Sequence, residues 1–190
     1  MSILLVLGIL AAVAASLVGI YNGLVAKNIA CDTGFAQITV QLKRRQDLIP
    51  NLLETVKGYA AHEKGTLEAV IKARNAAISS GASGDVQAQA QAESTLSGAL
   101  RQVFALSEAY PDLKANQNFL QLQSELASTE NQISSVRQDY NAAVSAFNTA
   151  IQQVPGNFVA GFGSFSKRQF FELSAEEQQA VQTPPKVSFS

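Results

Sequence analysis

Residues 3–20 read ILLVLGILAAVAASLVGI, and no charged side chain occurs before Lys27. As an α-helix, the segment from Ile3 to Ala26 would be about 36 Å long, which is enough to cross a hydrocarbon layer of about 30 Å with some tilt. The sequence therefore predicts a single transmembrane anchor at residues 1–26, followed by a soluble helical domain.

Two other N-terminal signals fit this segment less well. A cleaved signal peptide has a basic start and an apolar stretch of about 7–15 residues, whereas this apolar run is longer and no Lys or Arg precedes it. A lipoprotein signal needs a leucine-type residue three positions before its cysteine, and Asn28 holds that position before Cys31. Lys27 and the basic residues 43–45 follow the span, so the positive-inside rule favours a cytoplasmic main domain.

The composition argues against several classes of function. A net charge of −1, with neither a basic patch nor an acidic tail, predicts no nucleic-acid partner. Cys31 is the only cysteine, so no intrachain disulfide forms, and we expect it to be a small buried residue. His62 is the only histidine, which excludes metal sites that need two. No pair of carboxylates stands out by its spacing. We therefore predict no metal, no cofactor and no enzymatic activity.

Apolar residues beyond the span recur at alternating three- and four-residue intervals, the pattern of a coiled-coil helix. Asn28 and Arg45 interrupt this stripe. Its members are Leu24, Cys31, Phe35, Ile38, Leu42, Ile49, Leu52, Val56 and Tyr59, and it then drifts to Leu67, Ile71 and Ile78. The pattern predicts one helix from the membrane to about Ser79. We expect a bend near Pro50, because proline removes one hydrogen bond of the helix.

Turn and capping residues divide the rest of the chain. Residues 79–84, SSGASG, predict a loop, and Asp85 suits the N-cap of a second helix that ends near Pro111. Asn116 suits the N-cap of a third helix, which Pro155 and Gly156 end. A capping box at residues 174–177 predicts one short helix before a loose tail that begins at residue 184.

Three long helices with one apolar stripe each must pack against one another. The predicted fold is therefore all-α, with the membrane-spanning helix continuing into an elongated antiparallel bundle. The predicted domains are the anchor at 1–26, the bundle at 27–172, and the short helix with its tail at 173–190.

Several separated segments, in order, resemble one known family. They are YN at 21–22, QLKRRQDLIPNL at 41–52, VKGY at 56–59 with HE at 62–63, EAYPDLK at 108–114, and TEN at 129–131 through Arg137 to YN at 140–141. This set resembles the LemA family over roughly residues 20–172. The resemblance implies a bacterial inner-membrane protein with a short exterior N-terminus, one span and a helical cytoplasmic domain. It supplies no activity and no catalytic residues.

One group of polar residues follows helical spacing. Its members are Arg44, Asp47, Asn51 and Glu54 in the first helix, and Glu130, Ser134, Arg137, Asn141 and Asn148 beside the stripe of the third. Two interpretations stay open. The residues form a hydrogen-bonded seam that fixes helix register, since buried polar groups need partners, or they form a docking face for a partner protein or a second subunit.

Two further features are candidate contact surfaces. Five of the ten phenylalanines fall within fourteen residues, and they are Phe158, Phe162, Phe165, Phe170 and Phe171. They form either a cap over the open end of the bundle or an interface with another subunit or with lipid. Small residues recur every four positions in the span, at Ala11, Ala15, Gly19 and Gly23. This spacing lets transmembrane helices approach closely.

Together these features predict a non-enzymatic, membrane-anchored helical scaffold or assembly protein. Its expected partners are the lipid membrane, further copies of itself and other envelope proteins. The alternative is a regulator or sensor that binds and controls a membrane protease or signalling protein.

Overall fold

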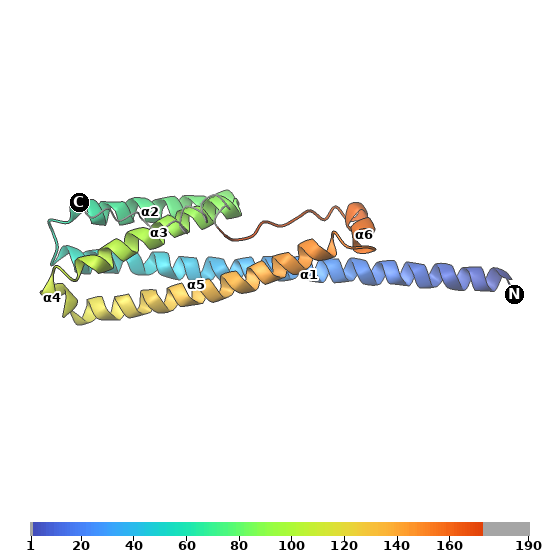
Figure 1. Ribbon diagram of the computed structural model, residues 1–190, viewed down its shortest axis with the longest axis horizontal. Helices are drawn as coiled ribbons and strands as arrows, with labels where there is room; N and C mark the ends of the chain where they lie inside the picture. Colours follow the sequence, from blue (N-terminus) through green and yellow to red (C-terminus); the bar gives the residue numbers. More distant parts are fainter. Residues whose placement is uncertain (1, 173–190) are drawn as a thin grey trace, which may run out of the picture. The chain divides into compact units, whose positions relative to one another are not determined.

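The computed structural model describes residues 2–172, and in this range the chain forms six α-helices and no β-strand (Figure 1). The helices are α1 (Ser2–Lys57), α2 (Lys64–Ser83), α3 (Val86–Leu106), α4 (Pro111–Lys114), α5 (Gln117–Ala150) and α6 (Gly156–Phe162). The predicted all-α fold is confirmed. The predicted capping box at 174–177 and the tail from residue 184 lie outside the described residues.

The chain divides into two compact units. Of the described residues, unit 1 comprises 2–40 and 133–170, and unit 2 comprises 41–132 together with 171–172. The first part of α1 and the second part of α5 belong to unit 1, as does α6, while α2, α3 and α4 belong to unit 2.

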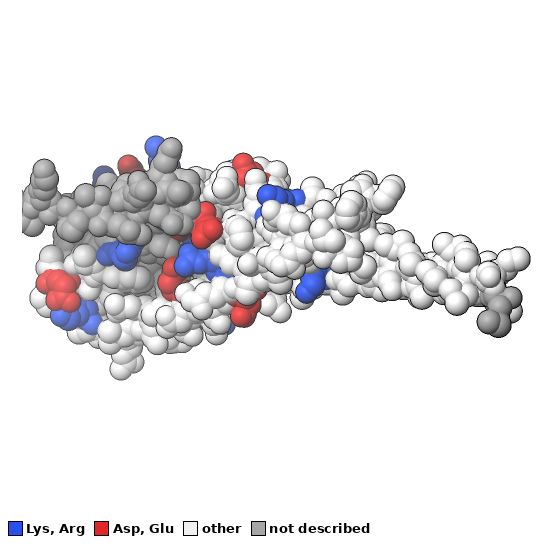
Figure 2. All heavy atoms as spheres, turned by 45° about the vertical axis from the view of Figure 1, so that its right-hand side comes forward, with Lys and Arg blue, Asp and Glu red and all other residues white. Residues whose placement is uncertain are grey.

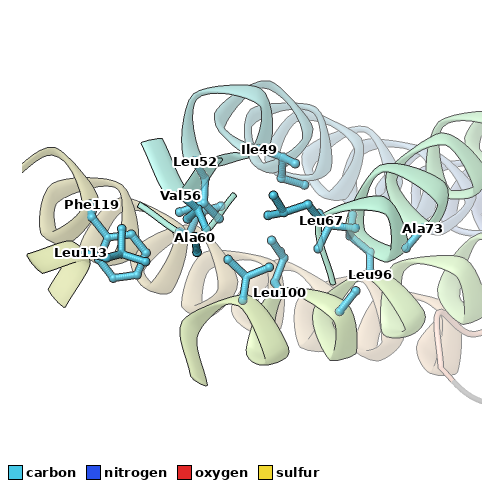
Figure 3. Packing of buried hydrophobic residues seen from close by; sticks show 14 of the residues in the cluster. Ile49, Leu52, Val56, Ala60, Leu67, Ala73, Leu96, Leu100, Leu113 and Phe119 are labelled. Atoms are coloured by element: carbon cyan, nitrogen blue, oxygen red, sulfur yellow. The ribbon is translucent and has the colours of Figure 1, made fainter. Parts of the chain in front are cut away.

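The core of unit 2 is built by four long helices, and the short α4 adds Leu113 (Figure 3). Leu52 and Val56 of α1 are fully buried, and the same cluster contains Val70 of α2, Val103 of α3 and Phe119 of α5. Burying these side chains supplies most of the driving force for folding, at roughly 1.5–3 kcal/mol for each large apolar residue. Four packed helices, rather than three, therefore stabilise this unit.

The prediction of one helix reaching Ser79 is wrong, because α1 ends at Lys57 and α2 begins at Lys64. Gly58 follows the end of α1 directly, and glycine has a poor helix propensity. Ala60 is buried in the turn, and its N–H donates to the Val56 carbonyl at 2.8 Å. The reversal lets α2 pack its own apolar face into the core, which a continuous helix would leave without partners.

Two further expectations differ from the structure: the apolar stripe beyond Tyr59 and the loop at residues 79–84. Ile71 and Ile78 are exposed, whereas Val70 and Ala77 are buried. Most of the predicted loop at 79–84 is helical, and the turn is confined to Gly84, whose φ of 75° is the left-handed conformation that glycine adopts most easily.

Two predicted caps are confirmed. The Asp85 carboxylate accepts hydrogen bonds from the N–H groups of Gln87 and Ala88, at 3.0 and 3.1 Å. The Asn116 side-chain oxygen accepts from the Phe119 N–H at 3.0 Å. Each cap satisfies N–H groups that the first turn of a helix leaves without partners.

In unit 1 the apolar stripe predicted along α1 is buried, and α5 buries residues at the same seven-residue spacing. Leu24, Cys31 and Ile38 of α1 are buried, and so are Ile133, Tyr140 and Phe147 of α5. Gly34 is also buried, and a Cβ atom there would lie 3.2 Å from the Cα of Tyr140, so this glycine permits close approach of the two backbones. The third helix, which we expected Pro155 and Gly156 to end, stops earlier, at Ala150, and Val154 is exposed.

The N-terminal part of α1 differs from all other described segments, because every side chain from residue 2 to residue 19 is exposed. This part carries no charge, and it forms the white rod at the right of Figure 2. Within the described residues, α1 is the one helix long and apolar enough to cross a membrane. An apolar helix exposed on all sides is stable in lipid rather than in water.

Candidate functional site

A buried cluster of charged residues joins the four helices of unit 2. Arg45 of α1 is 2% exposed, and its guanidinium group forms ion pairs with Glu93 of α3 and Glu130 of α5. Its Nη1 atom also donates to the Ser97 hydroxyl at 2.7 Å, and its Nη2 atom donates to the Glu93 backbone carbonyl at 3.3 Å. We call Arg45, Glu93, Ser97 and Glu130 the buried ion cluster.

Two further hydrogen bonds extend this cluster. The Gln46 side-chain amide donates to Glu93 Oε1 at 3.1 Å, and the Arg74 Nε of α2 donates to the Gln46 backbone carbonyl at 2.9 Å. A buried charge is costly unless it is paired. Sliding one helix along another would separate these pairs, so the contacts hold the four helices in one register. The ion pairs of Arg45 with Glu93 and Glu130 join α1 to α3 and α5, which favours a structural role for the cluster.

The predicted polar seam is wrong in its composition on α1. Arg44, Asp47, Asn51 and Glu54 are all exposed, whereas Arg45, which we expected to interrupt the apolar stripe, is the buried polar residue. Two neighbouring positions on a helix face directions about 100° apart, and Arg45 falls on the core face between Leu42 and Ile49. A signal was present, because an arginine in the middle of an apolar stripe requires buried acidic partners.

On α5 the predicted residues separate into several environments. Glu130 belongs to the buried ion cluster, and Asn148 bonds to the chain of unit 1 described below. Arg137 is exposed and Asn141 is half-buried. The structure therefore does not bring the predicted polar residues together as one group, and the docking-face interpretation remains a prediction for the exposed members.

In unit 1 the segment that follows α6 is fastened by Arg168. Its Nε and Nη2 atoms donate to the Asn28 side-chain oxygen at 3.0 and 2.8 Å, and Nη2 lies 2.8 Å from an Asp32 carboxylate oxygen. The Asn148 side chain bonds to both the N–H and the carbonyl of Arg168, at 2.8 and 2.9 Å. The Tyr140 hydroxyl donates to the Gln169 carbonyl at 2.8 Å. These bonds fix the segment along α1 and α5.

The five clustered phenylalanines do not act as one group. Phe165 packs inward, with its ring centroid 5.7 Å from that of Tyr21 and 6.1 Å from that of Phe147. Phe170 is half-buried and Phe171 is buried. Phe158 and Phe162 are exposed. Phe165 and Phe171 therefore pack against the protein, whereas the two phenylalanines of α6 are available for contact with something else.

The small residues of the span lie on an open surface. Ala11, Ala15, Gly19 and Gly23 are exposed, and an added Cβ atom at either glycine would meet nothing within 4 Å. Among the described residues, no side chain covers this face of α1, so it is open to contact with a second helix.

Three titratable groups of the described residues have raised pKa values. Burial raises the pKa of the Cys31 thiol, so the reactive thiolate is disfavoured. Burial likewise raises the pKa of Tyr140, while the hydrogen bond to Glu63 raises that of Tyr110. His62 is exposed. Among residues 2–172, no three His, Cys, Asp or Glu side chains are grouped to hold a metal ion.

An open hollow in unit 2 is lined by Tyr59 and Asp112 and by residues 115–118. Asn116 donates to the Tyr59 hydroxyl there at 2.9 Å. The hollow contains one carboxylate and neutral polar groups, which do not form a nucleophile with its base.

Comparison with known proteins indicates the family whose sequences this chain matches. A sequence model of the LemA family matches residues 34–189. The magnetosome protein MamQ 2 of Paramagnetospirillum magneticum is 25% identical, over 95% of this chain and 76% of the relative. The magnetosome protein MamQ of Magnetospirillum gryphiswaldense is 22% identical, over 86% and 69%. Protein LemA of Metamycoplasma hominis is 29% identical, over 74% and 64%.

Proposed function

Because this chain belongs to the LemA family, we propose that it is a non-enzymatic, membrane-anchored helical protein that works by assembling with itself or with other envelope proteins. The observation that carries the proposal is the exposure of residues 2–19 at the start of a helix that continues without interruption into the packed part of unit 1. An uncharged helix with no protein around it requires lipid or another transmembrane helix.

The proposed topology follows from charge. The first cations after the span are Lys27 and the residues Lys43 and Arg44, and residues 1–26 contain no Lys or Arg. This bias supports a short N-terminus outside the bacterial inner membrane and a cytoplasmic main domain.

Self-association through the span is the most direct form of assembly. The open ladder of Ala11, Ala15, Gly19 and Gly23 supports it, because small residues at four-residue spacing allow helix backbones to approach and gain van der Waals contact.

The test is crosslinking of the full chain in native membranes, comparing the unaltered protein with a Gly19→Ile/Gly23→Ile variant. Ala14→Ile is the matched control, since it adds the same side chain within the span but off the ladder. We expect the double variant to lose crosslinked oligomers and the control to keep them. Unchanged oligomers in the double variant would refute association through this face.

A second candidate is a regulator that binds a membrane protease or signalling protein. The exposed Arg44, Asp47, Asn51 and Glu54 support it, because they form a charged surface on α1 that the folding of unit 2 does not use. Gentle detergent extraction followed by mass spectrometry of the intact complex separates the candidates. A stoichiometric homo-oligomer favours assembly, and a distinct co-purifying enzyme favours regulation.

A further inference from the structure

We propose that α6 rests on the lipid surface beside the point where α1 leaves the membrane, with Phe158 and Phe162 inserted at the boundary between headgroups and acyl chains. This inference depends on the proposed membrane anchor. It assigns to α6 a second, peripheral membrane contact.

The position of α6 along α1 is fixed by aromatic contacts. Tyr21 directly follows the apolar run at 3–20, and its ring packs against Phe165 with centroids 5.7 Å apart. Gly163, the residue after α6, lies so close that a Cβ atom there would be 3.2 Å from the Tyr21 ring. The C-terminal end of α6 is therefore at the level where the apolar run ends.

The direction of the following segment shows on which side of Tyr21 the helix α6 lies. Arg168 bonds to Asn28 and Asp32, which are farther from the apolar run than Tyr21 is. The chain from Phe165 to Arg168 thus runs away from the membrane, and α6 precedes it. Figure 1 shows α6 beside α1, between the end of α5 and the N-terminus.

The outward face of α6 is aromatic. Phe158 is 63% exposed and Phe162 is 94% exposed, and residues four apart share one face of a helix. Val159 and Ala160 are buried, and the Ala160 carbonyl accepts from the Phe165 N–H at 3.1 Å. The helix is therefore held by its inner face, and its two large rings point away from unit 1.

Lipid is the occupant that this arrangement favours. Phenylalanine is among the side chains that interfacial helices bury at the boundary between headgroups and acyl chains. The patch adjoins the end of the proposed span. Residues 154–170 contain no Asp or Glu, and Lys167 is exposed, so no carboxylate of this segment opposes anionic headgroups.

The absence of tryptophan from the natural chain permits a direct test. Phe162→Trp would place a single reporter on α6 of the full protein, reconstituted in vesicles of phosphatidylcholine and phosphatidylglycerol. Val40→Trp is the control, since Val40 is 63% exposed in unit 1 and lies about 28 Å farther along α1 than Tyr21. Leu10→Trp reports on the span itself. Circular dichroism checks that each variant folds, and Phe158→Trp replaces Phe162→Trp should the latter lose helicity.

Lipids brominated near the top of the acyl chain quench tryptophan at the interface. Lipids brominated near the end of the acyl chain quench tryptophan at the bilayer midplane and are used for Leu10→Trp, since Leu10 lies roughly 16 Å from Tyr21 along α1. We expect loss of most of the Phe162→Trp emission and no loss for Val40→Trp. Quenching of Leu10→Trp without quenching of Phe162→Trp would overturn this inference and leave the anchor intact. Absence of quenching for Leu10→Trp would overturn the anchor and this inference together. The emission of Phe162→Trp could instead be blue-shifted but not quenched, with the shift disappearing when the protein is diluted in lipid. That result would show that a second copy covers the patch and would overturn contact with lipid.

Discussion

Replacement of Arg45 by alanine should strongly destabilise unit 2. Arg45 is 2% exposed and Glu93 is 4% exposed, so the variant would leave the Glu93 carboxylate buried with a single side-chain donor, the Gln46 amide. Removing one partner of a buried ion pair costs about 3–5 kcal/mol. Glu130 is 50% exposed and becomes solvated when Arg45 is lost, so it should add little to this cost.

Two further variants separate the effect of burial from that of charge. Lys43 and Asp47 form an ion pair of 2.6 Å on the same helix, but their side chains are 69% and 54% exposed. Lys43→Ala should therefore cost only about 0–1 kcal/mol. The double variant Arg45→Met/Glu93→Met removes both buried charges. It should return to within about 1–3 kcal/mol of the natural protein, the remaining loss coming from the Gln46 amide left without its acceptor.

The measurement is urea unfolding of the full chain in detergent micelles, followed by the helical circular dichroism signal. The span stays helical in the micelle, so the loss of signal reports the folded units, and shifts in midpoint at constant slope give the differences in stability. Equal losses for Arg45→Ala and Lys43→Ala would refute the reasoning. So would a double variant less stable than Arg45→Ala, because the cost would then not arise from an unpaired buried charge.

Three further predictions use the same protein. Asp85→Ala removes two N-cap hydrogen bonds of α3 and should lower the free energy of unfolding by about 1 kcal/mol. Asp85→Asn keeps a side-chain oxygen at the cap and should retain most of this stability. An equal loss in both variants would contradict the capping role. Gly34→Ala places a Cβ atom 3.2 Å from the Tyr140 Cα and should lower the free energy of unfolding in the urea assay by about 1–3 kcal/mol. Gly98→Ala is the control, because its Cβ atom would meet open space, and it should stabilise α3 by up to about 1 kcal/mol. Burial raises the pKa of Cys31 above its ordinary 9.0, so the unfolded chain releases this proton first and stability should fall as the pH rises above about 9. Thermal midpoints measured across this range should fall less steeply in Cys31→Ala, and identical slopes would exclude the thiol as a cause.

The parts of the fold that the sequence predicted correctly are those governed by local chemistry. The seven-residue repeat identified Leu24, Cys31 and Ile38 as core residues because a helix face is set by spacing alone. Asp85 and Asn116 were identified as caps because an N-cap needs only a side-chain oxygen near the first turn.

The failures are those in which tertiary packing decides. Gly58 weakens a helix, but only the burial gained when Leu67 and Val70 fold back against α1 makes a reversal there favourable. Arg45 looked like a defect of the apolar stripe because its acidic partner Glu93 lies 48 residues away on α3, and no local pattern links the two. The outward direction of Phe158 and Phe162 depended on where α6 docks, which composition does not specify.

Within unit 1, no linker separates the apolar run at 3–20 from the part of α1 that packs against α5, and this continuity constrains how the protein can assemble. Leu24 is 2% exposed only four residues after the apolar run, and α1 is helical throughout, so the span cannot turn independently of the unit as it could on a flexible tether. At about 100° per residue, Gly19 and Gly23 lie roughly 120° around the helix from Leu24 and on the side opposite Tyr21. Pairing of two spans through the glycines would therefore compete neither with the packing of α5 on Leu24 and Cys31 nor with α6 beside Tyr21. A single rigid helix can thus hold the unit, rest α6 on the lipid and receive a second copy on three different faces.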